Sequence, residues 1–140
     1  LFLFSCYTSL RIGDVLQLNR QSFEEGYIKI QAQKTGKLHN IKLIKKAEAI
    51  KTDMFRLIDK IPTPEYINRA LKEIAKAVNI QKRVTFHVAR HTFATQYLKV
   101  GGKVETLQKI LGHSNIRETM VYVHLNQEQM DSDIGLLDGL

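Results

Sequence analysis

The segment HVARH, residues 87–91, brings one guanidinium and two imidazoles together within about one helical turn. On a helix running through this segment, Arg90 falls near the middle of an apolar arc, and His87 and His91 fall toward one edge. The arc comprises Ala89, Phe93, Ala94, Tyr97 and Leu98. A buried guanidinium needs an anionic partner. That partner is either an internal carboxylate such as Asp14 or a phosphate held by bidentate hydrogen bonds, for which arginine is well shaped.

Other reactive side chains stand near the ends of the elements that the sequence predicts. They are Arg11, Lys34, His113 and Tyr122. Taken singly, each has an ordinary explanation. Arg11 could form an ion pair with Asp14, and Lys34 could be a solvated turn residue. His113 could cap the C-terminus of a helix, and Tyr122 could be a packing residue. The ends of rigid elements are also where side chains converge on a shared cleft. Together with the segment HVARH, these residues therefore predict one anion-binding site beside a phenol.

The elements that must position these residues combine one small sheet with several helices. Apolar and polar residues alternate from 27 to 43, which predicts an antiparallel hairpin with Lys34 at its tip and a short third strand near Phe23. Helical periodicity predicts helices at 1–10, 13–18, 44–58, 67–78, 87–100, 104–111 and 115–123. We expect an α+β fold, mainly α, with a small antiparallel β-sheet.

Capping and burial can also be predicted for individual helices. Gly13 and Ser114 are the expected N-caps of the helices that follow them. Ile74 and Val78 are expected on the buried stripe of helix 67–78, whereas Tyr122 falls off the inner stripe of the last helix.

The charge of the chain favours a polyanionic partner. Its 140 residues carry a formal net charge of +7, and residues 1–124 carry 21 basic against 10 acidic side chains, a net charge of +11. Nucleic acid is the commonest polyanion, although general solubility explains such a charge equally well. The length fits one domain, the single Cys6 excludes an internal disulfide, and no apolar stretch is long enough to cross a bilayer. We therefore expect a cytoplasmic protein.

Four segments resemble, in order, the signature blocks of the tyrosine recombinase, or phage integrase, catalytic domain. They are TSLRIGDVLQL, QKTGK, HVARHTFATQYLKVGG and LQKILGHSNIRETMVYVH. The resemblance spans roughly Thr8 to His124, and the combination of H-x-x-R-H, L-G-H-S and a following tyrosine is highly specific. It implies a site-specific DNA recombinase that cleaves and rejoins DNA through a 3′-phosphotyrosine intermediate.

The resemblance implies a catalytic site of six residues: Arg11, Lys34, His87, Arg90, His113 and Tyr122. Tyr122 would be the nucleophile, the two arginines would hold the scissile phosphate, and Lys34 would protonate the departing 5′ oxygen. A phenol has a pKa of about 10, so its attack needs a proton acceptor, which His87 or His113 could supply. Asp14 and His91 are expected to be structural, with His91 a buried hydrogen-bonding side chain.

Neither a cofactor nor a metal is expected in this site. His87 and His91 have the i, i+4 spacing of a zinc site, but Val88 stands where such sites carry glutamate, and Arg90 would repel the ion. The implied partners are double-stranded DNA and, in the full-length protein, three further copies that form a homotetramer on paired sites. We expect this chain to be a fragment without the N-terminal core-binding domain and the start of the catalytic domain, monomeric by itself and without a membrane partner.

The last segment, residues 125–140, is acidic and contains no Lys or Arg. Met130, Ile134 and Leu137 recur at helical spacing within it, which predicts a short amphipathic segment. Such a segment either is exchanged between subunits or docks onto its own domain, and the sequence leaves both open.

The chain departs from the family pattern at three places outside the six positions. Ser9 stands where glycine is usual, Asp14 where glutamate is typical, and the segment IKL at 41–43 lacks the common proline. A type IB topoisomerase shares the phosphotyrosine chemistry and is one alternative. A DNA-binding module that has lost activity is the other, although all six positions are filled. The sequence leaves three biological tasks open: integration, excision and chromosome-dimer resolution.

Overall fold

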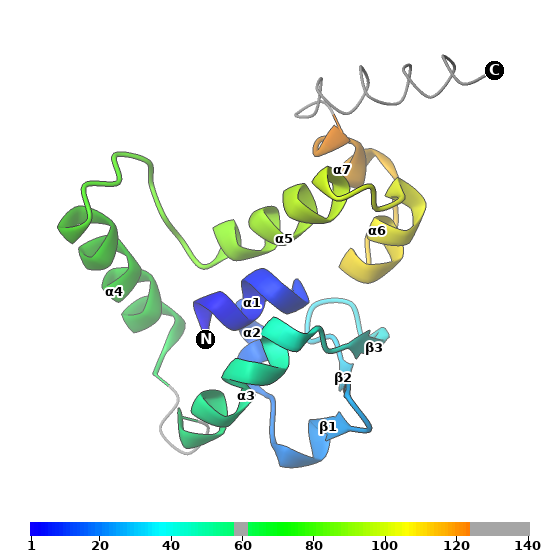
Figure 1. The fold of residues 1–140 in the computed structure, drawn as a ribbon, viewed down its shortest axis with the longest axis horizontal. Coiled ribbons are helices and arrows are strands. Elements are labelled where there is room, and N and C mark those ends of the chain that lie inside the picture. The colour runs from blue at the N-terminus through cyan, green and yellow to red at the C-terminus, as the bar shows by residue number, and fades with distance from the viewer. Residues whose placement is uncertain (58–61, 124–140) are drawn as a thin grey trace. The chain divides into compact units, whose positions relative to one another are not determined.

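The computed structural model describes residues 1–57 and 62–123 (Figure 1). The chain forms two compact units, an N-terminal unit of residues 1–93 and a C-terminal unit of residues 94–140. The predicted amphipathic segment at 125–140 lies outside the described residues. Within the described part of the chain, no helix has both the length and the apolar character that a membrane span requires.

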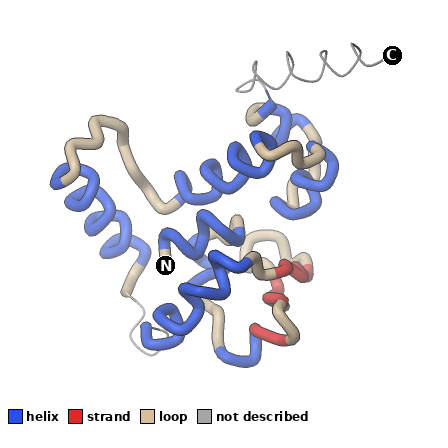
Figure 2. Tube along the Cα trace, viewed as in Figure 1, coloured by secondary structure: helices blue, strands red, loops and turns tan. Residues whose placement is uncertain are grey.

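The N-terminal unit contains several helices and one small sheet, which lies to one side of the helices (Figure 2). Its elements are α1 (Phe2–Thr8), α2 (Ile12–Leu16), a 3-10 turn (Arg20–Ser22), β1 (Phe23–Glu24), β2 (Tyr27–Gln31), β3 (Leu38–Lys42), α3 (Lys45–Leu57) and α4 (Pro64–Ala77). Helix α5 (His87–Lys99) begins in this unit and ends in the C-terminal unit. The prediction of a mainly helical α+β fold is confirmed.

The three strands form one antiparallel sheet in the order β1-β2-β3. Ile28 pairs with Ile41, and Ile30 pairs with His39, so these four side chains share one face of the β2–β3 hairpin. Ile28 is fully buried and Ile30 nearly so. The predicted hairpin and its short third strand are therefore confirmed, because period-2 alternation marks a half-buried strand.

The core of the N-terminal unit lies between the sheet and the helices. Helix α1 packs beside α3 (Figure 1). The buried cluster consists of Phe4, Leu10, Val15, Leu18, Ile28, Ile30, Ala47, Met54, Ile67 and Phe86. Helix α4 starts with Pro64 after the N-cap Thr63, whose side chain accepts a hydrogen bond from the backbone N–H of Tyr66 at 3.3 Å.

Two predictions for this unit are wrong. The N-cap of α2 is Arg11 rather than Gly13, because the backbone at Arg11 is still extended (φ −70°, ψ 160°) and Gly13 already lies inside the helix. Ile74 and Val78 are 59% and 60% exposed. The buried face of α4 is narrower than its apolar stripe. Of this stripe, Ile67 belongs to the buried core cluster and Leu71 is partly buried against it.

The described part of the C-terminal unit contains the end of α5, then α6 (Val104–Leu111) and α7 (Arg117–Met120). The glycines after α5 and α6 adopt the left-handed conformation, with φ +86° at Gly101 and +64° at Gly112, which is typical of residues that follow a helix C-terminus. Leu107 and Leu111 are fully buried. The predicted cap of the last helix is wrong, because the N-cap of α7 is Ile116, which makes no side-chain capping hydrogen bond. Asn115 Oδ1 accepts a hydrogen bond from the N–H of Arg117 at 2.9 Å.

Candidate active site

The turn between α1 and α2 positions the first arginine. Helix α1 ends at Ser9, which adopts the left-handed conformation at φ 63°, with its N–H donating to Ser5 O at 2.9 Å. The chain then turns into α2 with Arg11 as its N-cap. The positive φ explains why a glycine is usual at this position, because a residue with a Cβ pays a steric penalty there.

Arg90 is anchored to the same turn. Its side chain is 3% exposed, and its Nη1 donates to the backbone oxygen of Ser9 at 3.0 Å. The prediction that Arg90 is turned into the apolar side of α5 is therefore confirmed. Nη1 of Arg11 is also buried, and it has no hydrogen-bond partner among the described residues. A buried, unpartnered guanidinium nitrogen is costly and marks a place where an anion would be stabilised.

The sequence suggested Arg11 or Arg90 as the partner of Asp14, but its hydrogen-bond partner is a backbone N–H group. Its carboxylate is buried, and Oδ1 accepts a hydrogen bond from the backbone N–H of Gln33 at 2.9 Å. This bond ties α2 to the loop that carries Lys34. Lys34 itself is exposed in the turn between β2 and β3, which Gly36 closes at φ +66° by donating its N–H to Ala32 O at 2.8 Å. Asp14 thus fixes the base of the turn that presents Lys34.

The electrostatic environment of His87 shows which charged side chains lie near it. Its pKa is lowered mainly by partial burial, and then by the charges of His91, Arg90, Arg11 and Lys34. Four of the six predicted residues, Arg11, Lys34, His87 and Arg90, therefore lie in one neighbourhood of the N-terminal unit. A lowered pKa keeps the His87 imidazole neutral at neutral pH, as a proton acceptor must be.

His91 does not lie where the sequence predicted. It is exposed rather than buried, and its ring packs edge-on against that of His87, with centroids 4.5 Å apart and planes at 88°. The reason is its place on α5, one residue beyond Arg90 and therefore rotated away from the buried side.

His39 on β3 belongs to the same neighbourhood and was missed by the sequence analysis. Its pKa is lowered mainly by burial, and further by Arg11, Arg90 and Lys37, while Asp14 acts in the opposite direction. Its Nε2 is buried and has no hydrogen-bond partner in the described chain. Residue 39 shares the strand face of Ile41, so the alternation that predicted the hairpin already placed it inward.

The C-terminal unit holds the other two predicted residues. His113 follows the left-handed Gly112 directly, and its N–H donates to Gln108 O at 3.1 Å, which fixes it at the end of α6. The Nδ1 atom of His113 and Oγ1 of Thr119 are 2.9 Å apart, and Thr119 is fully buried. The sequence analysis missed Thr119, whose only signal is its position one turn before Tyr122.

Tyr122 is buried, with 5% of its surface exposed, which contradicts the prediction that it falls off the inner stripe. The reason is that α7 ends at Met120, so the helical period does not extend to residue 122. Tyr122 instead lies in a turn in which its N–H donates to Thr119 O at 3.1 Å.

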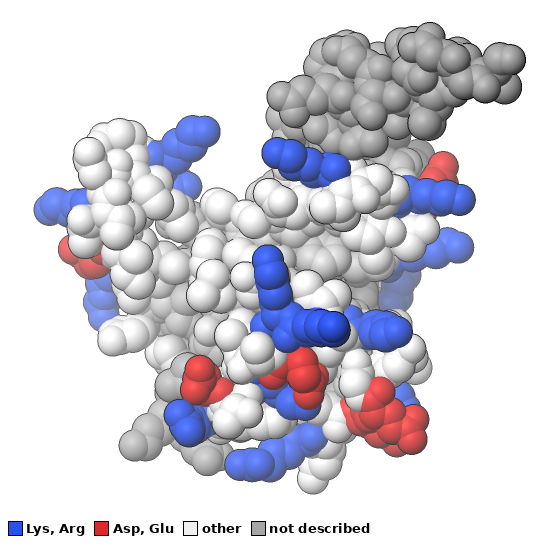
Figure 3. Space-filling model, viewed as in Figure 1, with Lys and Arg blue, Asp and Glu red and all other residues white. Residues whose placement is uncertain are grey.

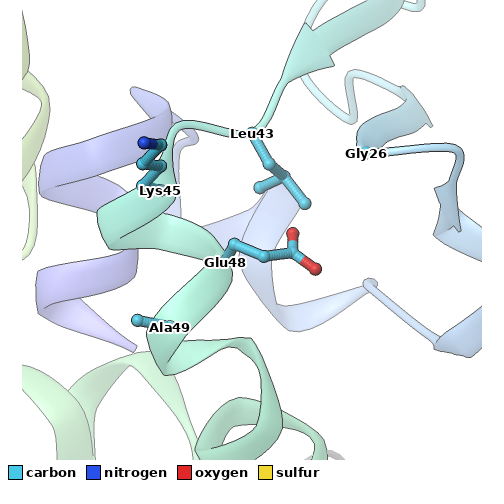
Figure 4. Close-up of a pocket in the computed structure, with 5 residues that line it drawn as sticks. All are labelled: Gly26, Leu43, Lys45, Glu48 and Ala49. Atoms are coloured by element: carbon cyan, nitrogen blue, oxygen red, sulfur yellow. The ribbon is translucent and has the colours of Figure 1, made fainter.

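A surface hollow exists elsewhere in the N-terminal unit, between α3 and the turn at Gly26 (Figure 4). Gly26, Leu43, Lys45, Glu48 and Ala49 line it. It contains none of the predicted site residues. Over residues 1–57 and 62–123, no group of three or more His, Cys, Asp or Glu side chains is arranged to hold a metal ion. On the face drawn in Figure 3, Lys and Arg side chains are widely exposed, and Asp and Glu gather toward its lower edge.

Solved structures of tyrosine recombinases share this fold. The crystal structure of XerA recombinase matches with a TM-score of 0.75 and 26% sequence identity, over 94% of this chain and 54% of that one. The XerH site-specific recombinase, bound to a palindromic difH substrate in a post-cleavage complex, matches in fold with a TM-score of 0.73 at 18% identity, over 98% and 45% of the two chains. The fold is therefore that of a tyrosine recombinase catalytic domain.

Sequence comparison identifies the family. Residues 1–129 match the phage integrase family, and the chain belongs to that family. A tyrosine recombinase of Pseudothermotoga lettingae is 29% identical over 140 aligned residues, which cover 90% of this chain and 49% of that protein. Tyrosine recombinase XerD of Halalkalibacterium halodurans is 42% identical over 62 residues, or 44% of this chain and 21% of that protein. The chain spans less than half the length of these curated relatives.

Proposed function

We propose that this chain is the catalytic part of a tyrosine-type, site-specific DNA recombinase. It cleaves a DNA strand by transesterification, holds the end as a 3′-phosphotyrosine, and rejoins it to another strand. The single observation that supports this most is the gathering of Arg11, Lys34 and Arg90 around His87, where a buried guanidinium nitrogen of Arg11 has no hydrogen-bond partner among residues 1–57 and 62–123. The names of the relatives, which are recombinases and integrases, point the same way.

The arginines stabilise the charge of the reacting phosphate. In a phosphodiester transfer, the equatorial oxygens gain charge in the transition state, and cations fixed beforehand lower the barrier without reorganising. The Ser9 carbonyl holds the Arg90 guanidinium in place before DNA binds, and the start of α2 fixes the backbone of Arg11. The buried Arg11 Nη1 then has a non-bridging phosphate oxygen as its hydrogen-bond acceptor.

Tyr122 supplies the nucleophile. Its hydroxyl oxygen forms a bond to phosphorus as the bond from phosphorus to the 5′ oxygen breaks. The phenolic proton goes to His87 or His113, and Lys34 gives a proton to the departing 5′ oxygen. Because Tyr122 is only 5% exposed, its hydroxyl must become accessible to the DNA before this step.

The partners of the reaction follow from the same chemistry. Strand exchange needs two duplexes, so we propose double-stranded DNA as substrate and a homotetramer of the full-length protein on paired sites. The acidic segment at 125–140 would be exchanged between neighbouring subunits of that tetramer. Binding of this chain alone to DNA would rest mainly on phosphate contacts and would weaken steeply as salt is raised.

The proposal is tested with a nicked suicide duplex. After cleavage, the short segment between the cleavage site and the nick, which carries the freed 5′ hydroxyl, diffuses away, and its loss traps the covalent complex. The full-length protein should give an adduct that survives denaturation, Tyr122→Phe should give none, and a chelator should leave the yield unchanged. Adduct formation by Tyr122→Phe would show that another residue is the nucleophile. An inactive wild-type protein that still binds DNA would favour a binding module.

A further inference from the structure

Three buried polar atoms in the described chain have no hydrogen-bond partner, and all three belong to the surroundings of Arg90. They are Oγ of Ser9, Nη1 of Arg11 and Nε2 of His39. Ser9 bonds Arg90 directly through its carbonyl, and the charges of both arginines act on His39. Unsatisfied buried polar groups are rare in folded proteins and need a specific explanation. Their concentration here indicates a ligand with several acceptor oxygens.

His39 is the new member of this group. It is the second residue of β3, opposite Ile30, so the sheet register fixes its backbone, and its side chain is partly buried. The neighbouring residues on the strand, Leu38 and Asn40, are exposed. Of residues 38–40, only His39 therefore has its side chain on the inner face of the strand, near the two arginines.

We propose that His39 binds the phosphate of the DNA substrate, donating a hydrogen bond from Nε2–H to a non-bridging oxygen beside Arg11 and Arg90. This role rests on the proposed recombinase function for the identity of the substrate, but it concerns a residue outside the six predicted positions. A neutral imidazole protonated on Nε2 is a donor at that atom, so no change of charge is needed for the contact. The contact adds a third protein donor to the two guanidinium groups.

The charged groups around His39 make this contact dependent on pH. Arg11, at the start of α2, Arg90 on α5 and Lys37 in the β2–β3 turn disfavour the imidazolium, whereas the Asp14 carboxylate on α2 favours it. A bound phosphate adds negative charge beside the ring and offsets the three cations. The pKa of His39 therefore rises on binding, and by linkage phosphate binds more tightly as the pH falls through the range in which His39 titrates.

The first experiment follows the His39 imidazole by NMR in the full-length wild-type protein, with inorganic phosphate as the probe and His39→Gln to assign the resonance. Phosphate should shift the His39 titration to higher pH, and chloride at equal ionic strength should not. An unchanged titration midpoint at saturating phosphate would overturn the proposal. This experiment needs no DNA cleavage, so it tests the role of His39 separately from the proposed recombinase function. The absence of a covalent adduct with the wild-type protein would refute the proposed function, whereas the NMR titration would still decide whether His39 binds phosphate.

The second experiment compares variants in the rate of covalent adduct formation on nicked duplex DNA. His39→Leu should slow the reaction about tenfold to hundredfold, the range for losing one hydrogen bond to a charged group. His39→Gln, which keeps an amide donor near the Nε2 position, should recover most of the rate and should lose the pH dependence that His39 contributes. Asn40→Leu, on the exposed face of the same strand, is the matched control. Equal rates for His39→Leu and Asn40→Leu would contradict the proposal. It would also be contradicted if the slower reaction of His39→Leu followed from a lowered thermal unfolding midpoint that His39→Gln shares.

Discussion

Oγ1 of Thr119 lies 2.9 Å from Nδ1 of His113, and this contact joins the end of α6 to α7. Whichever of the two atoms donates, this contact engages Nδ1 and fixes the orientation of the imidazole ring. Thr119 is fully buried, so the hydroxyl holds the imidazole in one orientation without competition from bulk water.

Replacing Thr119 by valine should therefore slow adduct formation about tenfold, the usual order for losing a hydrogen bond that orients a functional histidine. Valine keeps the shape of threonine and removes only the hydroxyl. Thr119→Ser keeps the hydroxyl and should stay within about threefold of wild type. The check is the rate of adduct formation of both variants, with their thermal unfolding midpoints measured beside it. Equal rates for the two variants would show that the contact has no role in the reaction.

The bond from Gln33 N–H to Asp14 predicts a coupling between a buried carboxylate and the Lys34 turn. Asp14→Ala should lower the free energy of unfolding by about 1–3 kcal/mol, because it removes a hydrogen bond to a charged acceptor. The same variant should speed hydrogen exchange at the Gln33 amide and slow DNA cleavage. Asp14→Asn keeps an acceptor oxygen and is the matched control. Unchanged exchange at Gln33 in Asp14→Ala would contradict this role.

The left-handed backbone at Ser9 predicts an asymmetric response to substitution. Ser9→Gly should change the free energy of unfolding by less than about 1 kcal/mol, because relief of the steric penalty is offset by the greater flexibility of glycine when unfolded. Ser9→Val should lower it by about 1–3 kcal/mol, since a β-branched residue is strained at φ 63°. The Ser9 carbonyl would then shift away from Arg90, and cleavage should fall with stability. Thermal unfolding and the cleavage rate of both variants provide the check.

The contact between the rings of His87 and His91 predicts a change in a measurable pKa. The pKa of His87 is lowered from its usual 6.5 by burial first and by the neighbouring charge of His91 second. His91→Gln should therefore raise the pKa of His87 and move the acid limb of the cleavage profile to higher pH. His91→Lys keeps a positive charge and should not. The titration of His87 followed by NMR measures this directly, and an unchanged pKa in His91→Gln would refute it.

The lowered pKa values of His39 and His87 also determine how the free energy of unfolding changes with pH. The pKa values of His39 and His87 are lower in the folded protein than in the unfolded chain, so the unfolded chain binds more protons between the two values. Their contribution to stability is therefore complete above pH 6.5, the usual value, and is lost as the pH falls through the folded-state values. His39→Gln should flatten this part of the stability profile in chemical denaturation. A profile identical to wild type would show that folding does not shift the pKa of His39.

The parts of the fold that follow from local periodicity could be predicted from the sequence. The β2–β3 hairpin follows from alternation, and the ends of α5 and α6 follow from Gly101 and Gly112, because glycine adopts positive φ without strain. The inward orientation of Arg90 could be predicted in the same way, since the period of α5 places it among buried alanines.

What could not be predicted depends on contacts between segments distant in sequence. Arg90 bonds a backbone carbonyl 81 residues away, and Asp14 bonds a backbone N–H 19 residues away. Backbone carbonyl and N–H groups are present at almost every residue and carry no sequence signal, so neither partner was identifiable. Tyr122 was misplaced because periodicity cannot show where a short helix stops.

The central claim is that Tyr122 becomes linked to the 3′ phosphate of the cleaved strand. The most direct measurement is mass spectrometry of the protease-treated covalent complex, formed on duplexes labelled at either the 5′ or the 3′ end of the cut strand. The account predicts a nucleotide attached to the peptide that contains Tyr122, and retention of the 5′ label alone. Attachment at another residue, or retention of the 3′ label, would contradict it.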